Sequence, residues 1–161
     1  MFRYFETQID PFRRHDQTVP PANLPAFYWR YCRQVWPLLA CLMASGLVVS
    51  LIEVSMLRYI GSLVDMLRVT GPERVLQDYG PSFAWMGFVI LVARPLMGLT
   101  HDLLALQAIA PGMTNLVRWQ THHFVLRQSI SFFANDFAGR IASKIIQTGP
   151  SLRESVVQII D

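Results

Sequence analysis

Two long apolar stretches constrain this chain of 161 residues more than any other feature. The first begins near Val35 and the second near Phe83. A helix needs about 20 mainly apolar residues to cross the hydrocarbon core of a bilayer, where irregular backbone cannot satisfy its own polar groups. Both stretches reach that length. We therefore predict an all-α membrane protein with spans over about residues 36–57 and 83–109.

The composition agrees with this prediction. The chain is 52% hydrophobic and 16% charged, whereas a soluble domain is usually about one quarter charged. One lysine, Lys144, accompanies thirteen arginines. These arginines lie beside the apolar stretches, so lipid headgroups are the expected acidic partner and no nucleic acid is expected. Cys32 and Cys41 lack the spacing of a zinc site or a disulfide framework and are interpreted as packed free thiols.

The segment before the first span is expected to be a cytoplasmic lead-in over residues 1–25, broken by several prolines. Aromatic residues alternate with Arg30 and Arg33 over 26–35. This pattern is typical of a short elbow helix lying at the membrane interface. The alternative is that these residues are the first turns of the span itself. Pro37 is expected in the first turn of that span, where helices tolerate proline.

The connection between the spans predicts a transmembrane helical hairpin. Thr70-Gly71-Pro72 is a strong turn signal, and Gly80-Pro81 is expected to mark the start of the second span. Arginine and lysine residues are concentrated outside the two outer ends of the spans. This distribution predicts a multi-pass protein of the cell (inner) membrane with both termini in the cytoplasm.

The second span is expected to continue into the cytoplasm. Pro95 and Pro111 should distort this helix locally. A long cytoplasmic extension and loop is predicted over about 110–149, followed by the start of a third helix over 150–161, although a helical pattern is already visible from about Gly139.

Two charged residues lie inside the predicted spans. Glu53 shares a helix face with Ser50 and Gly46, and Arg94 shares one with Gly98 and His101. Measured from the Gly71 turn, Glu53 and Arg94 lie at similar heights, so we hypothesise an intramembrane polar pair or a shared water-filled cavity. The alternative is that both side chains lie near headgroup depth and reach the interface separately.

Other titratable residues carry weaker signals. His101 and Asp102 suggest a proton relay, but adjacent helix positions do not face each other. The pair His122-His123 lacks a third metal ligand, so no metal site is predicted.

The segment FFANDFAGRIASK, from Phe132 to Lys144, together with the predicted topology, resembles the first intracellular loop of the transmembrane domain of ABC exporters. The element IGSLVD from Ile60 to Asp65 and the opening around Ile9-Asp10-Pro11-Phe12 are similar to elements of proteobacterial half-transporters in that family. In the family this loop surrounds a coupling helix that docks on a nucleotide-binding domain. The resemblance thus implies docking residues here, namely Phe133, Asn135, Asp136, Phe137 and Gly139.

The resemblance implies that residues 26–161 are the N-terminal part of an incomplete ABC exporter transmembrane domain. The chain would be a portion of a transmembrane subunit that supplies two helices of the translocation path and the first coupling loop. Its expected partners are the lipid bilayer, a nucleotide-binding domain and a second transporter half, in a homodimer or a heterodimer.

No catalytic residue and no cofactor site is expected in this chain, because the phosphate-loop pattern G-x-x-x-x-G-K-[ST] is absent from its sequence. ATP and Mg²⁺ are implied only for the nucleotide-binding domain, and the chain is expected to be truncated. One alternative is a small stand-alone membrane hairpin that acts as a scaffold or regulator. Another is a soluble helical bundle, which would have to bury both apolar stretches without lipid.

Overall fold

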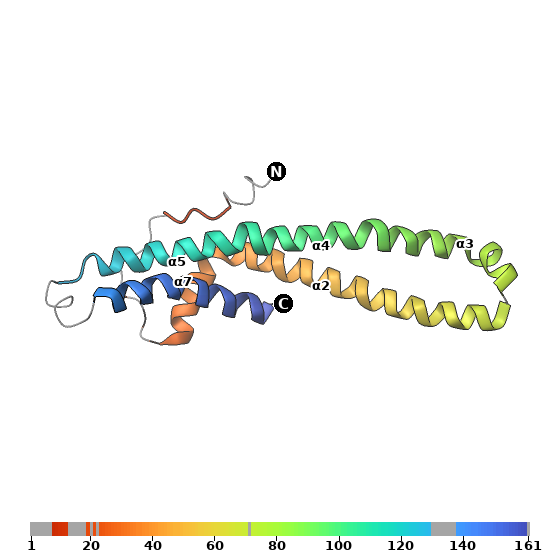
Figure 1. Cartoon of the computed structure of the whole chain (residues 1–161), viewed down its shortest axis with the longest axis horizontal. Coiled ribbons are helices and arrows are strands. Elements are labelled where there is room, and N and C mark those ends of the chain that lie inside the picture. The colour runs from red at the N-terminus through yellow and green to blue at the C-terminus, as the bar shows by residue number, and fades with distance from the viewer. Residues whose placement is uncertain are drawn as a thin grey trace. The chain divides into compact units, whose positions relative to one another are not determined.

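The computed structural model describes residues 8–12, 19, 21, 23–70, 72–129 and 138–160. All regular secondary structure within these ranges is helical, which confirms the predicted all-helical chain (Figure 1). Two runs, Leu24–Met66 and Tyr79–Val125, are long and apolar enough to cross a membrane. In chain order the elements are α2 (Leu24–Thr70), α3 (Pro72–Phe88), the π-helical segment η1 (Val89–Ala93), α4 (Arg94–Asp102), the π-helical segment η2 (Leu103–Ile109), α5 (Ala110–Val125) and α7 (Ala138–Ile160).

Helix α2 begins earlier than the first predicted span. The residues predicted to form an elbow helix, 26–35, belong to the same continuous helix α2, whose first part runs in a different direction from the part that follows (Figure 1). Pro37 consequently lies in the helix interior and not in its first turn. An interior proline removes one backbone donor, but Tyr31, Val35 and Leu39 are buried on one face across it. Burial of this apolar face keeps the helix continuous around Pro37.

The second helical run also begins earlier than predicted. Helix α3 starts at Pro72, so Gly80 and Pro81 lie inside it. Proline is well suited to the first position of a helix, where its missing N–H has no intrahelical partner in any case. The helix therefore begins before Gly80-Pro81, whereas the apolar run suited to a membrane begins beside these residues, at Tyr79, as predicted.

Two prolines of the second run, Pro95 and Pro111, are each preceded by a π-helical turn. The N–H of Arg94 donates to the carbonyl of Val89, and the N–H of Ala110 donates to that of Ala105. Each bond spans five residues and ends at the residue before a proline, Pro95 or Pro111. A proline lacks an N–H and its ring clashes with the carbonyl four residues earlier, and the wider π turn makes room for it. The distortions predicted at these prolines take this form.

The chain divides into two compact units. Unit 1 comprises the described residues of Met1–Met43 and Asp102–Asp161, and unit 2 is Ala44–His101. In unit 1, α5 and α7 lie side by side and run in opposite directions (Figure 1). The core of unit 1 is formed by buried apolar residues from α2, η2, α5 and α7 and by one residue that precedes α2: Ile9, Tyr31, Val35, Leu39, Leu42, Ile109, Met113, Leu116, Val117, Leu152 and Val156.

Helix α7 begins at Ala138, so the predicted boundary at residue 150 falls inside a helix. Pro150 cannot donate to the carbonyl of Ile146, four residues earlier. The Nε of Arg118 in α5 donates to that carbonyl at 3.3 Å and replaces the missing donor. A Cβ at Gly149 would lie 2.8 Å from the backbone oxygen of Thr114. Close packing on α5 therefore stabilises a Gly-Pro sequence within α7.

A short segment before α2 packs on unit 1, and we call Gln8–Phe12 the strap. Ile9 is 7% exposed and belongs to the core. A Cβ at Gly112 would lie 2.7 Å from the Ile9 side chain, so glycine allows the strap to approach α5. The Oδ1 of Asp10 accepts a hydrogen bond from the N–H of Phe12 at 2.9 Å, which fixes the turn that follows Ile9.

Candidate functional site

Unit 2 is a helical hairpin formed by the second part of α2 and by α3, η1 and α4 up to His101. Helix α2 ends at Thr70 and α3 begins at Pro72, on either side of the predicted turn at residue 71, which lies outside the described residues. The two arms lie side by side (Figure 1). Three side-chain contacts that join the arms lie at different levels, at increasing distance from the turn. In the first, which is nearest the turn, Tyr59 packs edge to face on Phe83 with ring centroids 6.2 Å apart.

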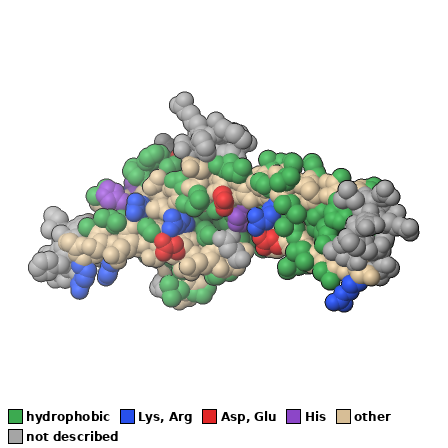
Figure 2. All heavy atoms as spheres, turned by 45° about the vertical axis from the view of Figure 1, so that its right-hand side comes forward, with side chains coloured by type: hydrophobic (Ala, Val, Ile, Leu, Met, Phe, Trp, Pro, Cys, Tyr) green, Lys and Arg blue, Asp and Glu red, His purple; other side chains and the backbone are tan. Residues whose placement is uncertain are grey.

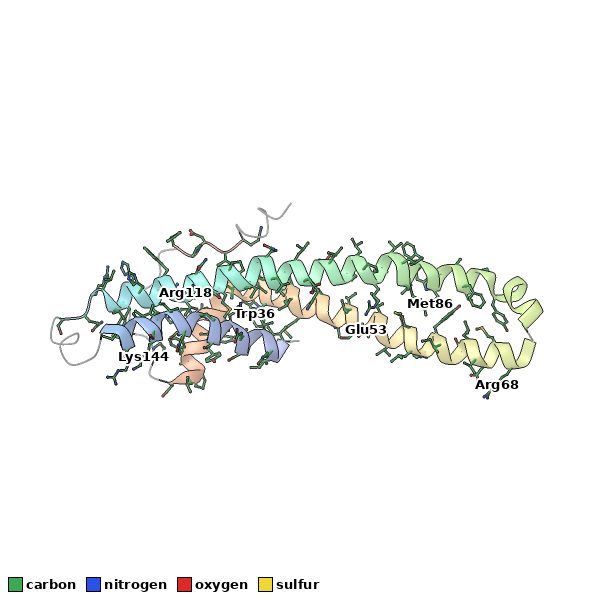
Figure 3. The ribbon with its side chains drawn as sticks, viewed as in Figure 1. Trp36, Glu53, Arg68, Met86, Arg118 and Lys144 are labelled. Atoms are coloured by element: carbon green, nitrogen blue, oxygen red, sulfur yellow. The ribbon has the colours of Figure 1, made fainter. Side chains whose placement is uncertain are left out.

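The second level of contact is an ion pair between the two charged residues singled out in the sequence. The Nη2 of Arg94 lies 3.1 Å from the Oε1 of Glu53. Their side chains remain 51% and 52% exposed, respectively. Glu53 is labelled on α2 in Figure 3. The hairpin thus brings together two residues that are 41 positions apart in sequence, at the same height from the turn.

The third level of contact joins Ser45 and His101. The Oγ of Ser45 lies 3.0 Å from the Nδ1 of His101. A Cβ at Gly46 would lie 3.4 Å from the Cε1 of His101, so the ring packs over this glycine. Sequence reasoning placed Gly46 and His101 on the polar faces but missed Ser45. Its position eight residues before Glu53, close to two helical turns, was the available signal.

The outward faces of the hairpin are apolar. Figure 2 shows hydrophobic side chains over much of the visible surface. Large apolar side chains that are exposed in unit 2 come from both arms: Leu47, Val48, Leu51, Val54, Leu57, Ile60, Val64, Trp85, Phe88, Ile90, Leu91, Val92, Leu96 and Leu99. Met86 is the buried large hydrophobic residue of this unit within the described side chains. Unit 2 therefore places polar contacts between its helices and apolar side chains outside.

Four of the five residues predicted to dock on a nucleotide-binding domain, Phe133, Asn135, Asp136 and Phe137, are not among the residues that the structure describes. Gly139 is exposed in the first turn of α7, and a Cβ added there would meet no neighbouring atom of the described residues within 4 Å. Their proposed role stays a prediction. Within the ranges that the structure describes, no group of three or more His, Cys, Asp or Glu side chains is arranged to hold a metal ion.

The chain is similar to an uncharacterized ABC transporter ATP-binding protein of Haemophilus influenzae. The two are 27% identical over 161 residues, which cover 99% of this chain and 26% of that protein. The chain thus spans about one quarter of the length of the curated relative it matches. No family model matches the chain. No solved structure matches it either.

The name of this relative corrects the function predicted from the sequence. The relative is named as the ATP-binding protein of an ABC transporter and not as a transmembrane subunit. The prediction that this chain is a portion of a transmembrane subunit, which supplies two helices of the translocation path and a coupling loop, is therefore wrong. The resemblance that led to it rested on residues 132–144 together with the predicted topology. What remains is the similarity to a protein named as part of an ABC transporter and two helices that are long and apolar enough to cross a membrane.

Proposed function

We propose that this chain is the membrane-embedded helical hairpin of an ABC transporter ATP-binding protein and that it holds this protein at the bilayer. The observation that carries the proposal is the outward apolar face of unit 2, with its polar contacts between the helices. Burying a large apolar side chain is worth about 1.5–3 kcal/mol relative to leaving it in water. The many exposed apolar side chains of unit 2 therefore favour transfer of the hairpin into lipid.

The charged residues of α2 indicate where one edge of the membrane-embedded segment lies. The exposed residues Arg58, Asp65 and Arg68 follow the end of the apolar stretch at Leu57. Charged side chains are unfavourable in hydrocarbon, by about 2.5–3.5 kcal/mol at the centre of a helix. We infer that the bilayer edge lies near Leu57 and that the turn near residue 71 projects beyond it.

The ATP-binding function would belong to a different part of such a protein. The phosphate-loop pattern is absent from these 161 residues, and the chain matches 26% of its relative. We therefore expect ATP and Mg²⁺ to bind in the larger part that this chain does not match. In this arrangement the role of the hairpin is to keep the ATP-binding part of the protein close to the membrane.

The ion pair suggests which surface of the hairpin contacts the rest of the transporter. Glu53 lies four residues before Leu57, which is about 6 Å along a helix. Its side chain and that of Arg94 are half exposed, and a half-exposed ion pair is unfavourable against lipid tails. We infer that water or other polar segments of the transporter complex cover this side of the hairpin.

Extraction of membranes with alkaline carbonate tests the insertion. The full chain is expected to stay with the membranes. A variant with Leu51→Arg and Leu91→Arg on the two outward faces should be released, because two charges then face lipid. Asp65→Arg is the matched control, since it adds an arginine beyond the apolar stretch, and it should stay with the membranes. Release of the unchanged chain would contradict the proposal.

Cysteine labelling tests the orientation, which we propose has both ends of the hairpin in the cytoplasm. Cys32 and Cys41 are first replaced by serine. A membrane-impermeant maleimide added to intact cells should then label Arg68→Cys near the turn and spare Arg127→Cys after α5. The reverse pattern would show the opposite orientation, and labelling at both positions would show that the hairpin does not span the bilayer.

A further inference from the structure

Unit 1 contains a cavity whose lining residues play no part in the proposed membrane insertion of unit 2. The cavity volume is about 510 Å³, within the range of about 300–1,000 Å³ for small-molecule sites. The strap, α5 and α7 all contribute to its wall. The lining residues are Pro11, Phe12, Asn115, Arg118, Trp119, His122 and Ile145.

One side of the cavity is an aromatic wall. The rings of Phe12 and Trp119 pack edge to face, with centroids 4.9 Å apart and planes at 80°. On α5 itself, His123 also packs on Trp119, with ring centroids 6.1 Å apart. These contacts hold the indole in place, while Trp119 remains 38% exposed. A planar apolar group that enters the cavity can stack on the indole or pack against its edge.

The polar side of the cavity is basic. The Nε of Arg118 is held by the carbonyl of Ile146, which fixes the plane of its guanidinium group. His122 and Asn115 add an imidazole and an amide to the lining, and no carboxylate of the described residues lines the cavity. Figure 3 labels Arg118 on α5. A fixed guanidinium group recognises oxyanions such as carboxylates and phosphates well, because its donors match two acceptor oxygens.

We propose that this cavity binds a small aromatic anion, with the ring against Trp119 and the carboxylate, sulfonate or phosphate group at Arg118. Asn115 donates a further hydrogen bond to the anionic group, and the imidazole of His122 lines the cavity beside it. Such a ligand would contact the strap, α5 and α7 together. The proposal concerns unit 1 and stands independently of whether unit 2 enters a bilayer.

Two probes that differ only in charge test this site on the unchanged protein. The full chain in lipid nanodiscs is titrated with naphthalene-2-sulfonate and with the neutral naphthalene-2-sulfonamide, with empty nanodiscs as the blank. The sulfonate is expected to bind saturably with one site per chain, and at least about tenfold more tightly than the sulfonamide, because a charge-assisted hydrogen bond is lost. Equal affinities, or uptake that does not saturate, would overturn the proposal.

Substitutions in the lining test whether the probe binds in this cavity. Arg118→Gln should reduce the affinity for the sulfonate about tenfold and leave that for the sulfonamide nearly unchanged. Arg127→Gln, which removes an arginine outside the lining, is the matched control and should change neither. Because Arg118 also supports α7, Asn115→Leu provides a second test and should weaken the sulfonate more than the sulfonamide, since a hydrogen bond to a charged group is lost. Unchanged sulfonate affinity in both lining variants would place the probe elsewhere and overturn the assignment.

Discussion

The helices of unit 1 pack their apolar side chains against one another, whereas the hairpin of unit 2 carries them on its outer faces. Leu116 in unit 1 is 2% exposed, and Leu51 in unit 2 is 59% exposed. Both residues lie in helical runs that are long and apolar enough to cross a membrane. The comparison teaches that hydrophobicity alone does not distinguish a protein core from a lipid-facing surface. What distinguishes the two units is where the apolar side chains lie, because unit 1 buries them between its helices and unit 2 exposes them on its outward faces.

The largest expected difference between the units comes from the same truncation in each. Leu116→Ala should lower the free energy of unfolding by about 2–5 kcal/mol, because it leaves a cavity in the core of unit 1. Leu51→Ala removes the same atoms from an outward face and should change it by about 0.5 kcal/mol. Denaturant unfolding in detergent micelles measures both. Equal losses would show that Leu51 is packed against protein.

A smaller effect is expected where α5 and α7 cross in unit 1. Gly149→Ala would place a Cβ 2.8 Å from the backbone oxygen of Thr114, and we expect a loss of about 1–3 kcal/mol from the shift of backbone that follows. Gly139→Ala in the same helix meets no neighbouring atom of the described residues and should stabilise by about 0.5–1 kcal/mol. The melting temperatures of the two variants give the comparison. A stable Gly149→Ala variant would mean that the helices are less closely packed.

The hairpin could be predicted from the sequence, but the packing of unit 1 could not. Apolar stretches of bilayer length and the signal around Gly71 predicted two antiparallel helices, and counting from that turn placed Glu53 level with Arg94. A helical pattern was visible from about Gly139, close to the start of α7 at Ala138, but the continuity of this helix through Gly149-Pro150 could not be predicted, because that dipeptide is locally a helix breaker. Its helical conformation depends on Arg118, which is remote in sequence and supplies the donor that Pro150 lacks.

The strap and the polar contacts show the same limit. Residues 1–25 were predicted as a broken lead-in, and nothing local indicated that Ile9 would enter the core against Gly112. Likewise, the reciprocal amide hydrogen bonds between Gln34 and Gln120 join α2 to α5 across 86 positions. Such contacts become visible only when the helices are placed. The role of the residues around Phe133 stays a prediction for a related reason, because they lie outside the described residues.

The smallest expected effect concerns the ion pair of unit 2. A double-mutant cycle with Glu53→Gln and Arg94→Leu should give a coupling energy of about 0.6 kcal/mol and at most about 1.7 kcal/mol, as is typical of polar contacts between membrane helices. The double variant should therefore be more stable than the sum of the single losses implies. Glu53→Gln combined with Arg68→Leu serves as the control cycle, and its effects should add. Additive losses in the first cycle would mean that the two charges act separately.

The most direct test of the central claim is the accessibility of spin labels on the outward faces of unit 2. In a chain with Cys32 and Cys41 replaced by serine, single labels at Leu51→Cys and Leu91→Cys are measured in lipid nanodiscs with oxygen and with a water-soluble nickel complex as collision partners. The account predicts high oxygen accessibility and low nickel accessibility at both positions, and the opposite at Arg68→Cys. High nickel accessibility at positions 51 and 91 would show that these faces contact water, and would contradict a membrane-embedded hairpin.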